Sequence, residues 1–327
     1  MSILTVCLSP GFQRSALVSH LEQGEVNRIT QVYVDVSGKA VNVSRVLHAL
    51  GVPTVCLGQG GDNAPDLLDL ARAEGLDLEL VPAKGSLRTC TSVIEPGGRV
   101  TELVEPACPV SEDCVRTLED RFLFHLKASR ALVIAGSMAS GFPADFQSRL
   151  LALAKDAGLP TYIDLHGASL RQAVATRPTF VKINLSEFSA TFLPESLRVG
   201  EAMGGDGSGV LDPVLAAALV RAARDLESDF ILTRGPWPVL VIRNGHLMEI
   251  PVPVLPRAEI VSPIGSGDSF MAGLLAGLAA GDVLDRPGSC TDAVLGESIR
   301  LAIACAQSNA RTARPGFLHD TIHPHLP

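Results

Sequence analysis

The sequence predicts an α/β fold in which helices flank a largely parallel central sheet and a small β-sheet flap lies beside it. Short apolar runs alternate with longer segments of helical period along most of the chain, which is the pattern of βαβ units. Two other stretches alternate apolar and polar residues with a period of two, as expected of an antiparallel sheet with one exposed face. The 327 residues, 46% of them hydrophobic, suffice to bury a large core.

The strands expected in the central sheet are short apolar runs, at residues 1–8, 131–135, 160–164, 180–183 and 230–233. Residues 144–157 and 213–227 carry apolar residues at three- and four-residue steps, so each predicts a helix packed on the sheet. The glycine-rich run 200–209 follows no strand directly, and we expect a surface loop there.

The flap is predicted from the alternating stretches 15–19, 31–36, 89–95 and 99–104. The last two enclose a Pro-Gly-Gly turn at 96–98. We therefore assign residues 13–36 and 86–106 to a small β lid, and residues 1–12, 37–85 and 107–327 to the α/β core domain.

Composition excludes several function classes. A formal net charge of −8 argues against nucleic acid, because binding to phosphate backbones needs a concentrated basic surface. No apolar run approaches the roughly 20 residues that span a bilayer, so no membrane partner is expected. The seven cysteines form an odd set without a CxxC pair, which favours free buried thiols and a cytoplasmic location. His319, His323 and His325 are expected to form an exposed tail rather than a metal site.

The segment with the clearest chemistry is Gly265-Ser266-Gly267-Asp268, which precedes a small and apolar helix. The glycines permit a tight backbone whose N–H groups converge at the helix start, where an anion such as phosphate is favoured. An aspartate there would repel the anion unless it had its own task, and general base toward an attacking hydroxyl is such a task. A simple helix cap is the alternative, and the local pattern leaves both open.

Several segments in order resemble the ribokinase-like carbohydrate kinases of the PfkB family. Besides the Gly-x-Gly-Asp loop, they are Gly-Glu-Val-Asn-Arg at 24–28, the glycine motif at 37–47, Ala-Gly-Ser at 135–137 and Asn-x-x-Glu at 184–187. The resemblance covers almost the whole chain. It implies a ribokinase-like fold and an ATP-dependent kinase reaction with magnesium, and a homodimer formed through the lid.

Within that family, residues 24–28, Gly38-Lys39 and Leu-Arg-Thr-Cys at 87–90 resemble the 1-phosphofructokinases and tagatose-6-phosphate kinases. This branch phosphorylates ketohexoses that already carry a phosphate. Arg88 would hold that phosphate through two hydrogen bonds, with Lys39 as a second positive charge. A solvated strand residue is the alternative for Arg88, and a surface cation is the alternative for Lys39.

The resemblance also assigns the remaining roles. Asp268 would be the catalytic base, and Gly265, Ser266 and Gly267 would stabilise the transferring phosphoryl group. The predicted substrate-binding residues are Gln13, Gly38, Lys39, Asn42, Arg88 and Ser137. The predicted nucleotide-binding residues are Lys182, Asn184, Thr233, Gly235, Ile303 and Gln307. Glu187 would act on Mg²⁺ through water. For the helix of Ile303 and Gln307, purely apolar packing is the alternative.

One departure affects the substrate. Gln13 stands where the family branch carries an aspartate that grips sugar hydroxyls, and glutamine is longer and uncharged. Two alternatives therefore stay open. The first is a kinase of an unphosphorylated sugar or a nucleoside on the same fold, and the second is a catalytically weak sensor of sugar phosphates.

Overall fold

A computed structural model describes residues 1–200, 209–286 and 288–323. Most of the glycine-rich run 200–209 lies outside the described residues, as does His325. The chain divides into two compact units. Unit one comprises Met1–Arg130, Met138–Phe142 and Leu255–Pro327, and unit two comprises Ala131–Ser137 and Pro143–Val254. Each unit is described by itself.

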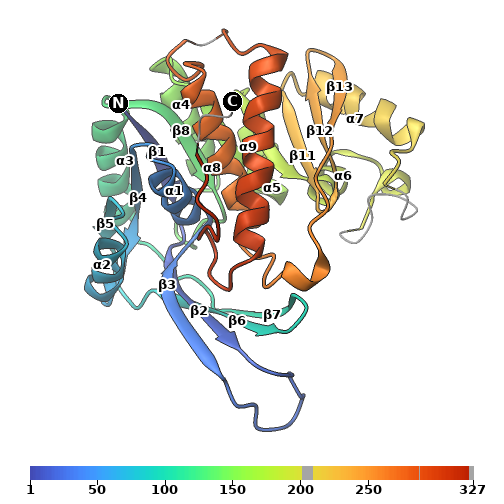
Figure 1. The fold of residues 1–327 in the computed structure, drawn as a ribbon. Helices are drawn as coiled ribbons and strands as arrows, with labels where there is room; N and C mark the ends of the chain where they lie inside the picture. Colours follow the sequence, from blue (N-terminus) through green and yellow to red (C-terminus); the bar gives the residue numbers. More distant parts are fainter. Residues whose placement is uncertain (201–208, 287, 324–327) are drawn as a thin grey trace. The chain divides into compact units, whose positions relative to one another are not determined.

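Unit one contains a three-stranded parallel sheet in the order β5-β4-β1, flanked by helices (Figure 1). The strands of this sheet are β1 (Ser2–Cys7), β4 (Thr54–Gly60) and β5 (Leu78–Pro82). The helices are α1 (Lys39–Ala49), α2 (Ala64–Ala73), α3 (Glu112–Leu126), α8 (Ser266–Ala280) and α9 (Asp292–Ala310), with a 3-10 turn at Arg257–Glu259. α8 packs against both α1 and α9.

A second, four-stranded sheet in unit one has the order β3-β2-β6-β7. Its strands are β2 (Gly11–Leu17), β3 (Gln31–Ser37), β6 (Arg88–Glu95) and β7 (Arg99–Val104). The central pair β2 and β6 is parallel, and both outer pairs are antiparallel. Because side chains alternate along strands, Gln13, Ser15 and Ser92 share one buried face, while Val34 and Leu103 are exposed on the other.

The contact between α8 and α9 depends on two glycines of α8. A Cβ at Gly273 would lie 2.7 Å from the Cα of Ala302, and a Cβ at Gly277 would lie 2.6 Å from the Cα of Ser298. Both distances are too short for a side chain, so the two helix backbones approach closely only because these positions are glycine. This close packing fixes α8, whose first turn carries Asp268.

Unit two contains a six-stranded sheet in the order β13-β12-β11-β10-β9-β8. Strands β8 to β11 are parallel, and β12 and β13 return antiparallel at the edge. The strands are β8 (Ser129–Ala135), β9 (Thr161–Asp164), β10 (Phe180–Asn184), β11 (Phe230–Arg234), β12 (Trp237–Arg243) and β13 (His246–Ile250). The helices are α4 (Phe146–Asp156), α5 (Gly167–Val174), α6 (Leu185–Phe192) and α7 (Pro213–Asp225), with a 3-10 turn at Glu195–Leu197.

The fold class predicted from the sequence is confirmed: the sheets are mostly parallel, helices flank them, and a separate small sheet is present. The boundaries predicted for core and lid stay a prediction. All seven cysteines are free, as expected, and five of them are buried.

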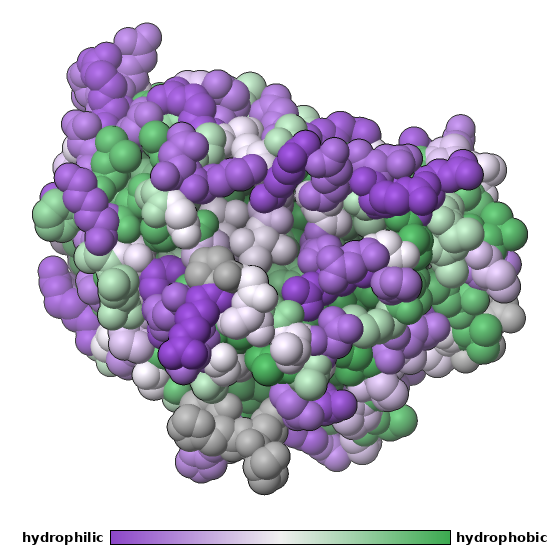
Figure 2. Space-filling view, turned by 90° about the horizontal axis from the view of Figure 1, so that it is seen from above, coloured by the Kyte–Doolittle hydropathy of each residue, from purple (hydrophilic) through white to green (hydrophobic). Residues whose placement is uncertain are grey.

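On the face of the molecule that Figure 2 shows, hydrophilic and hydrophobic residues are intermixed. Among the described residues, no helix combines the length and the apolar character that crossing a membrane requires.

Candidate active site

The loop before α8 builds a helix start with a special backbone. Gly265 is the N-cap of α8 and has φ of +84°, in the left-handed region that favours glycine. The Ser266 N–H donates back to the Pro263 carbonyl, and the Ser269 N–H donates to the Gly265 carbonyl at 2.9 Å. Apart from this bond of Ser266, the first N–H groups of a helix have no carbonyl within the helix to bind, and the helix dipole makes this end electropositive. An anion is therefore favoured at this turn.

We expect Gly265→Ala to lower the free energy of unfolding by about 2 to 6 kcal/mol, the sum of backbone strain and overpacking. The added Cβ would lie 2.8 Å from both the Gly316 nitrogen and the Pro315 Cα. Gly97→Ala is the matched control, because Gly97 has φ of +83° but nothing within 4 Å of its Cβ position. Denaturant titration measures both. Equal losses of stability in the two variants would show that residues 315–316 move to accommodate the added Cβ. The close contacts at Gly265 would then contribute nothing to the loss.

Asp268 is held by a residue 226 positions away in the sequence. Its Oδ2 accepts a hydrogen bond from Asn42 Nδ2 at 2.7 Å, and both side chains are buried, with Asp268 6% exposed. Asn42 lies in the first turn of α1, where its N–H donates to the Gly38 carbonyl. The starts of α1 and α8 therefore meet at this pair. Asp268 and Asn42, both predicted as site residues, are brought together.

Gly38 lets the start of α1 approach the end of β1 closely. It has φ of +135°, and a Cβ there would lie 2.4 Å from the Cys7 Sγ. Burial raises the pKa of the Cys7 thiol; Arg88 acts against this shift, and Asp268 adds to it. The charges of Arg88 and Asp268 thus both reach Cys7. The Cys7 side chain is buried and packs against the backbone at Gly38.

Arg88 begins β6 and is half-buried. Its Nη2 donates to the Ser9 carbonyl at 2.9 Å. Its Nε is buried and has no hydrogen-bond partner within the described part of the chain. A buried donor without an acceptor is costly, and an anionic oxygen is a strong acceptor for a guanidinium. Arg88 is therefore equipped to take an anionic ligand.

Gln13 lies on β2, opposite Asp35 and Cys90, and is 5% exposed. Its Nε2 donates to Ser92 Oγ at 2.9 Å, so part of its amide is already engaged inside the small sheet. Lys39 is the first residue of α1 and is half-buried. Ser137, in unit two, is exposed after the end of β8. Their predicted contacts with substrate stay predictions.

In unit two, the predicted nucleotide-binding residues gather at the carboxyl ends of β10 and β11. Asn184 and Thr233 are register partners there, and Gly235 follows in the turn to β12. Ligands of open parallel sheets bind outside these strand ends. Lys182, by contrast, is buried and forms an ion pair with Asp164, with Nζ to Oδ2 at 2.7 Å.

Asn184 and Glu187 form a capping box on α6. Asn184 Oδ1 accepts from the Glu187 N–H at 2.7 Å, and Glu187 Oε2 accepts from the Asn184 N–H at 3.0 Å. The Asn-x-x-Glu spacing is itself a sequence signature of such a box, which the sequence analysis did not use. One carboxylate oxygen of Glu187 is thus occupied by the backbone, and any role toward Mg²⁺ stays a prediction.

The last two predicted nucleotide residues lie on α9 in unit one, four positions apart and therefore on one face of the helix. Ile303 is 4% exposed, while Gln307 is half-buried. Burial of Ile303 within unit one agrees with the packing alternative for this part of the helix. Among the described residues, no group of three or more His, Cys, Asp or Glu side chains is placed to hold a metal ion.

Sequence reasoning assigned no role to Arg45, although its side chain is buried and donates to Asn42. Asn42 and Arg45 are three residues apart and therefore lie on one face of α1. This spacing was the feature of the sequence that could have indicated a role for Arg45. Arg314 was also missed. It forms an ion pair with Asp35 of β3 and lies over the Phe317 ring, 3.6 Å from the ring centroid.

Comparison with solved structures identifies proteins of the same fold. Phosphofructokinase-2 from Escherichia coli aligns with a TM-score of 0.76 and 22% sequence identity, over 95% of this chain and 93% of that one. A protein described as a possible 1-phosphofructokinase from Thermotoga maritima aligns with a TM-score of 0.77 and 20% identity, over 95% and 94%. A microbiome-derived acarbose kinase aligns with a TM-score of 0.68 and 19% identity, over 95% and 93%.

At these identities the likeness shows the fold. The sequence itself carries the assignment, because the family model for pfkB family carbohydrate kinases matches residues 12–318, which is most of the chain. This match confirms the resemblance found in the ordered motifs. The chain is a member of the pfkB family of carbohydrate kinases.

Proposed function

We propose that this carbohydrate kinase transfers a phosphoryl group from ATP to a hydroxyl of a phosphorylated ketohexose, as 1-phosphofructokinases and tagatose-6-phosphate kinases do. The observation that carries the reaction is the placement of Asp268. It is a buried carboxylate in the first turn of α8, bound by Asn42 at 2.7 Å and next to backbone N–H groups that favour an anion. A base and an anion site therefore stand side by side.

In the proposed reaction, Asp268 accepts the proton of the sugar hydroxyl as its oxygen attacks the γ-phosphorus of ATP. Asn42 orients the carboxylate through its hydrogen bond. The N–H groups of Gly265 and Gly267 donate to the oxygens of the transferring phosphoryl group, where negative charge is concentrated, while the bond from the Ser266 N–H to the Pro263 carbonyl holds the turn between them. ADP leaves with the oxygen that bridged the β- and γ-phosphorus atoms.

The choice of a phosphorylated substrate rests on Arg88. Its buried Nε has no partner within the described part of the chain, and its Nη2 is anchored on the Ser9 carbonyl. A phosphate satisfies a guanidinium donor better than a neutral hydroxyl does, because both partners are charged. Lys39 at the start of α1 supplies a second cation in this proposal.

ATP is assigned to the strand ends of unit two, where Asn184, Thr233 and Gly235 gather. Magnesium bound to a nucleotide keeps several waters and needs few protein ligands, so a dedicated cage of side chains is not required. Glu187 fits a contact through water, with one oxygen used by the capping box. The metal would neutralise charge on the ATP phosphates during transfer.

The small sheet is proposed to act as a lid and as the contact between two copies of the chain. The turn between β6 and β7 already touches the loop that leads to Gly265, since a Cβ at Gly98 would lie 2.8 Å from Cγ2 of Ile260. The exposed face of the sheet carries Val32, Val34 and Leu103, which are 39%, 49% and 61% exposed. Apolar side chains gathered on one sheet face are typical of an interface.

The second candidate function is phosphorylation of an unphosphorylated sugar or a nucleoside, and Gln13 is the observation that favours it. Gln13 replaces an expected aspartate, and its amide nitrogen is turned to Ser92. A coupled assay that records ADP formation separates the candidates. The substrates are fructose 1-phosphate, fructose 6-phosphate, tagatose 6-phosphate, free hexoses and nucleosides.

A kcat/KM at least ~10-fold higher for a ketohexose phosphate than for any free sugar supports the proposal. One hydrogen bond to a charged group contributes about this factor to binding. A preference for a free sugar or a nucleoside contradicts the substrate and supports the second candidate. No turnover with any of them, in a protein that binds sugar phosphates, points to a sensor.

A further inference from the structure

Arg45 is buried directly behind the pair of Asn42 and Asp268. It lies on α1, one turn after Asn42, and is 4% exposed. Its guanidinium donates four hydrogen bonds, to Asn42 Oδ1 at 2.8 Å, the Val36 carbonyl at 2.8 Å, the Pro315 carbonyl at 3.1 Å and Glu74 Oε2 at 2.7 Å. These acceptors come from α1, β3, the C-terminal segment and the end of α2, so the guanidinium has a single defined position.

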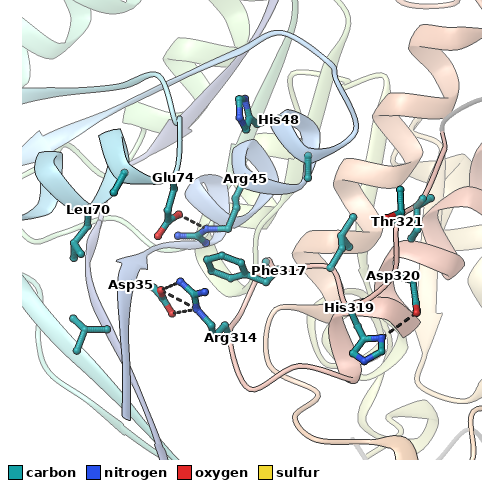
Figure 3. A pocket seen from close by; sticks show the side chains of 16 residues that line it. Asp35, Arg45, His48, Leu70, Glu74, Arg314, Phe317, His319, Asp320 and Thr321 are labelled. Atoms are coloured by element: carbon teal, nitrogen blue, oxygen red, sulfur yellow. Dashed lines mark hydrogen bonds and ion pairs between the residues drawn. The ribbon is translucent and has the colours of Figure 1, made fainter. Parts of the chain in front are cut away.

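Figure 3 shows this arrangement from the side of a cavity of about 620 Å³ that Arg45 and Glu74 both line. Arg45 points toward Glu74, and Phe317 lies beside it. The guanidinium carbon is 4.7 Å from the centroid of the Phe317 ring. The side chains of this ion pair are 5% and 13% exposed, so the carboxylate neutralises a charge that would be costly to bury alone.

The contact with Arg45 determines which way the Asn42 amide faces. A guanidinium only donates hydrogen bonds, so the amide oxygen must face Arg45. The amide nitrogen then faces Asp268, and an ionised carboxylate only accepts. Without Arg45, only the carboxylate fixes the orientation of the amide, and the bond that holds Asp268 is less well defined.

We propose that Arg45 is a positioning residue of this enzyme, which orients the catalytic carboxylate of Asp268 through the amide of Asn42 and is itself held by Glu74. The inference rests on the proposed role of Asp268 as the base. Arg45 contacts neither substrate nor nucleotide in this scheme. Its effect reaches the reaction only through Asn42, and this restriction makes the proposal testable.

The test is a double-mutant cycle on kcat with the variants Arg45→Met, Asn42→Ala and the two combined. We expect Arg45→Met to lower kcat by ~10-fold and to leave the KM for ATP unchanged, because it removes one hydrogen bond to a charged group. The double variant is expected to be no slower than Asn42→Ala alone, since both changes remove the same contact. Arg116→Met, an arginine exposed on α3, is the control and should leave kcat unchanged.

A purely structural role of Arg45 predicts a different result. Its effect on kcat would then multiply with that of Asn42→Ala in the double variant, and this outcome overturns the proposal. If Arg45→Met does not fold, the same double-mutant cycle with Arg45→Lys tests the proposal. Lysine keeps the positive charge beside Glu74 but lacks the planar set of N–H donors of a guanidinium. Asp268→Asn in the same assay separates the two claims. Near-normal turnover of Asp268→Asn would show that Asp268 is not the base. If Asp268→Asn loses turnover but the effects of the Arg45 and Asn42 variants multiply, only the proposed role of Arg45 is wrong.

Discussion

Asp268→Asn is expected to lower kcat by roughly 10² to 10⁴, the usual contribution of a positioned general base. The substitution keeps the shape of the side chain and an oxygen that still accepts from Asn42 Nδ2, so the first turn of α8 should remain in place. The reaction slows because an amide does not take up the proton of the attacking hydroxyl. Steady-state kinetics with the best substrate of the screen measures kcat, and binding of ATP is expected to be unchanged.

A matched control separates the base from a simple helix cap. Asp66 is an exposed aspartate in the first turn of α2, so Asp66→Asn removes a charge from an equivalent position without touching the site. A favourable charge at a helix start contributes about 0.3 to 1 kcal/mol to stability, and both variants should lose such an amount. Only Asp268→Asn should lose turnover. If its kcat stays within a few fold of the parent enzyme, Asp268 is a cap and the proposed mechanism is wrong.

Arg88→Ala is expected to raise the KM for a phosphorylated ketohexose by roughly 10- to 100-fold, the range for losing hydrogen bonds between charged groups. The KM for a free hexose should change much less, because a substrate without phosphate leaves the guanidinium unused. Parallel measurements of both KM values test this. The change should fall mainly on KM, since the phosphate that Arg88 holds takes no part in the transfer.

Arg14→Ala provides the control for Arg88. Arg14 lies on the same small sheet, is exposed, and stands on the opposite face, because Arg88 shares the face of Gln13. Removal of Arg14 should leave both KM values unchanged. If Arg88→Ala raises the KM values for phosphorylated and free sugars to the same extent, Arg88 has a structural role in the small sheet and does not bind the substrate phosphate. This result would favour the second candidate function.

The sequence predicted those features that local chemistry controls. The Gly-Ser-Gly-Asp loop has to form a tight turn before a helix, because the left-handed backbone at Gly265 suits glycine and the following residues are small and apolar. The parallel strands and the small sheet followed from hydrophobic periodicity, which depends only on which faces are buried. The capping box of Asn184 and Glu187 was not predicted, although their spacing of three is the local signature of such a box.

Tertiary structure decided which of these residues meet, because side-chain partners far apart in sequence depend on how whole elements pack. The bond between Asn42 and Asp268 joins helices 226 residues apart and exists because α1 packs on α8. The partner of Lys182 is Asp164 on the neighbouring strand, which no local pattern indicated. The guanidinium of Arg45 is held by hydrogen-bond acceptors from four segments of the chain. These acceptors surround Arg45 only because the four segments pack together.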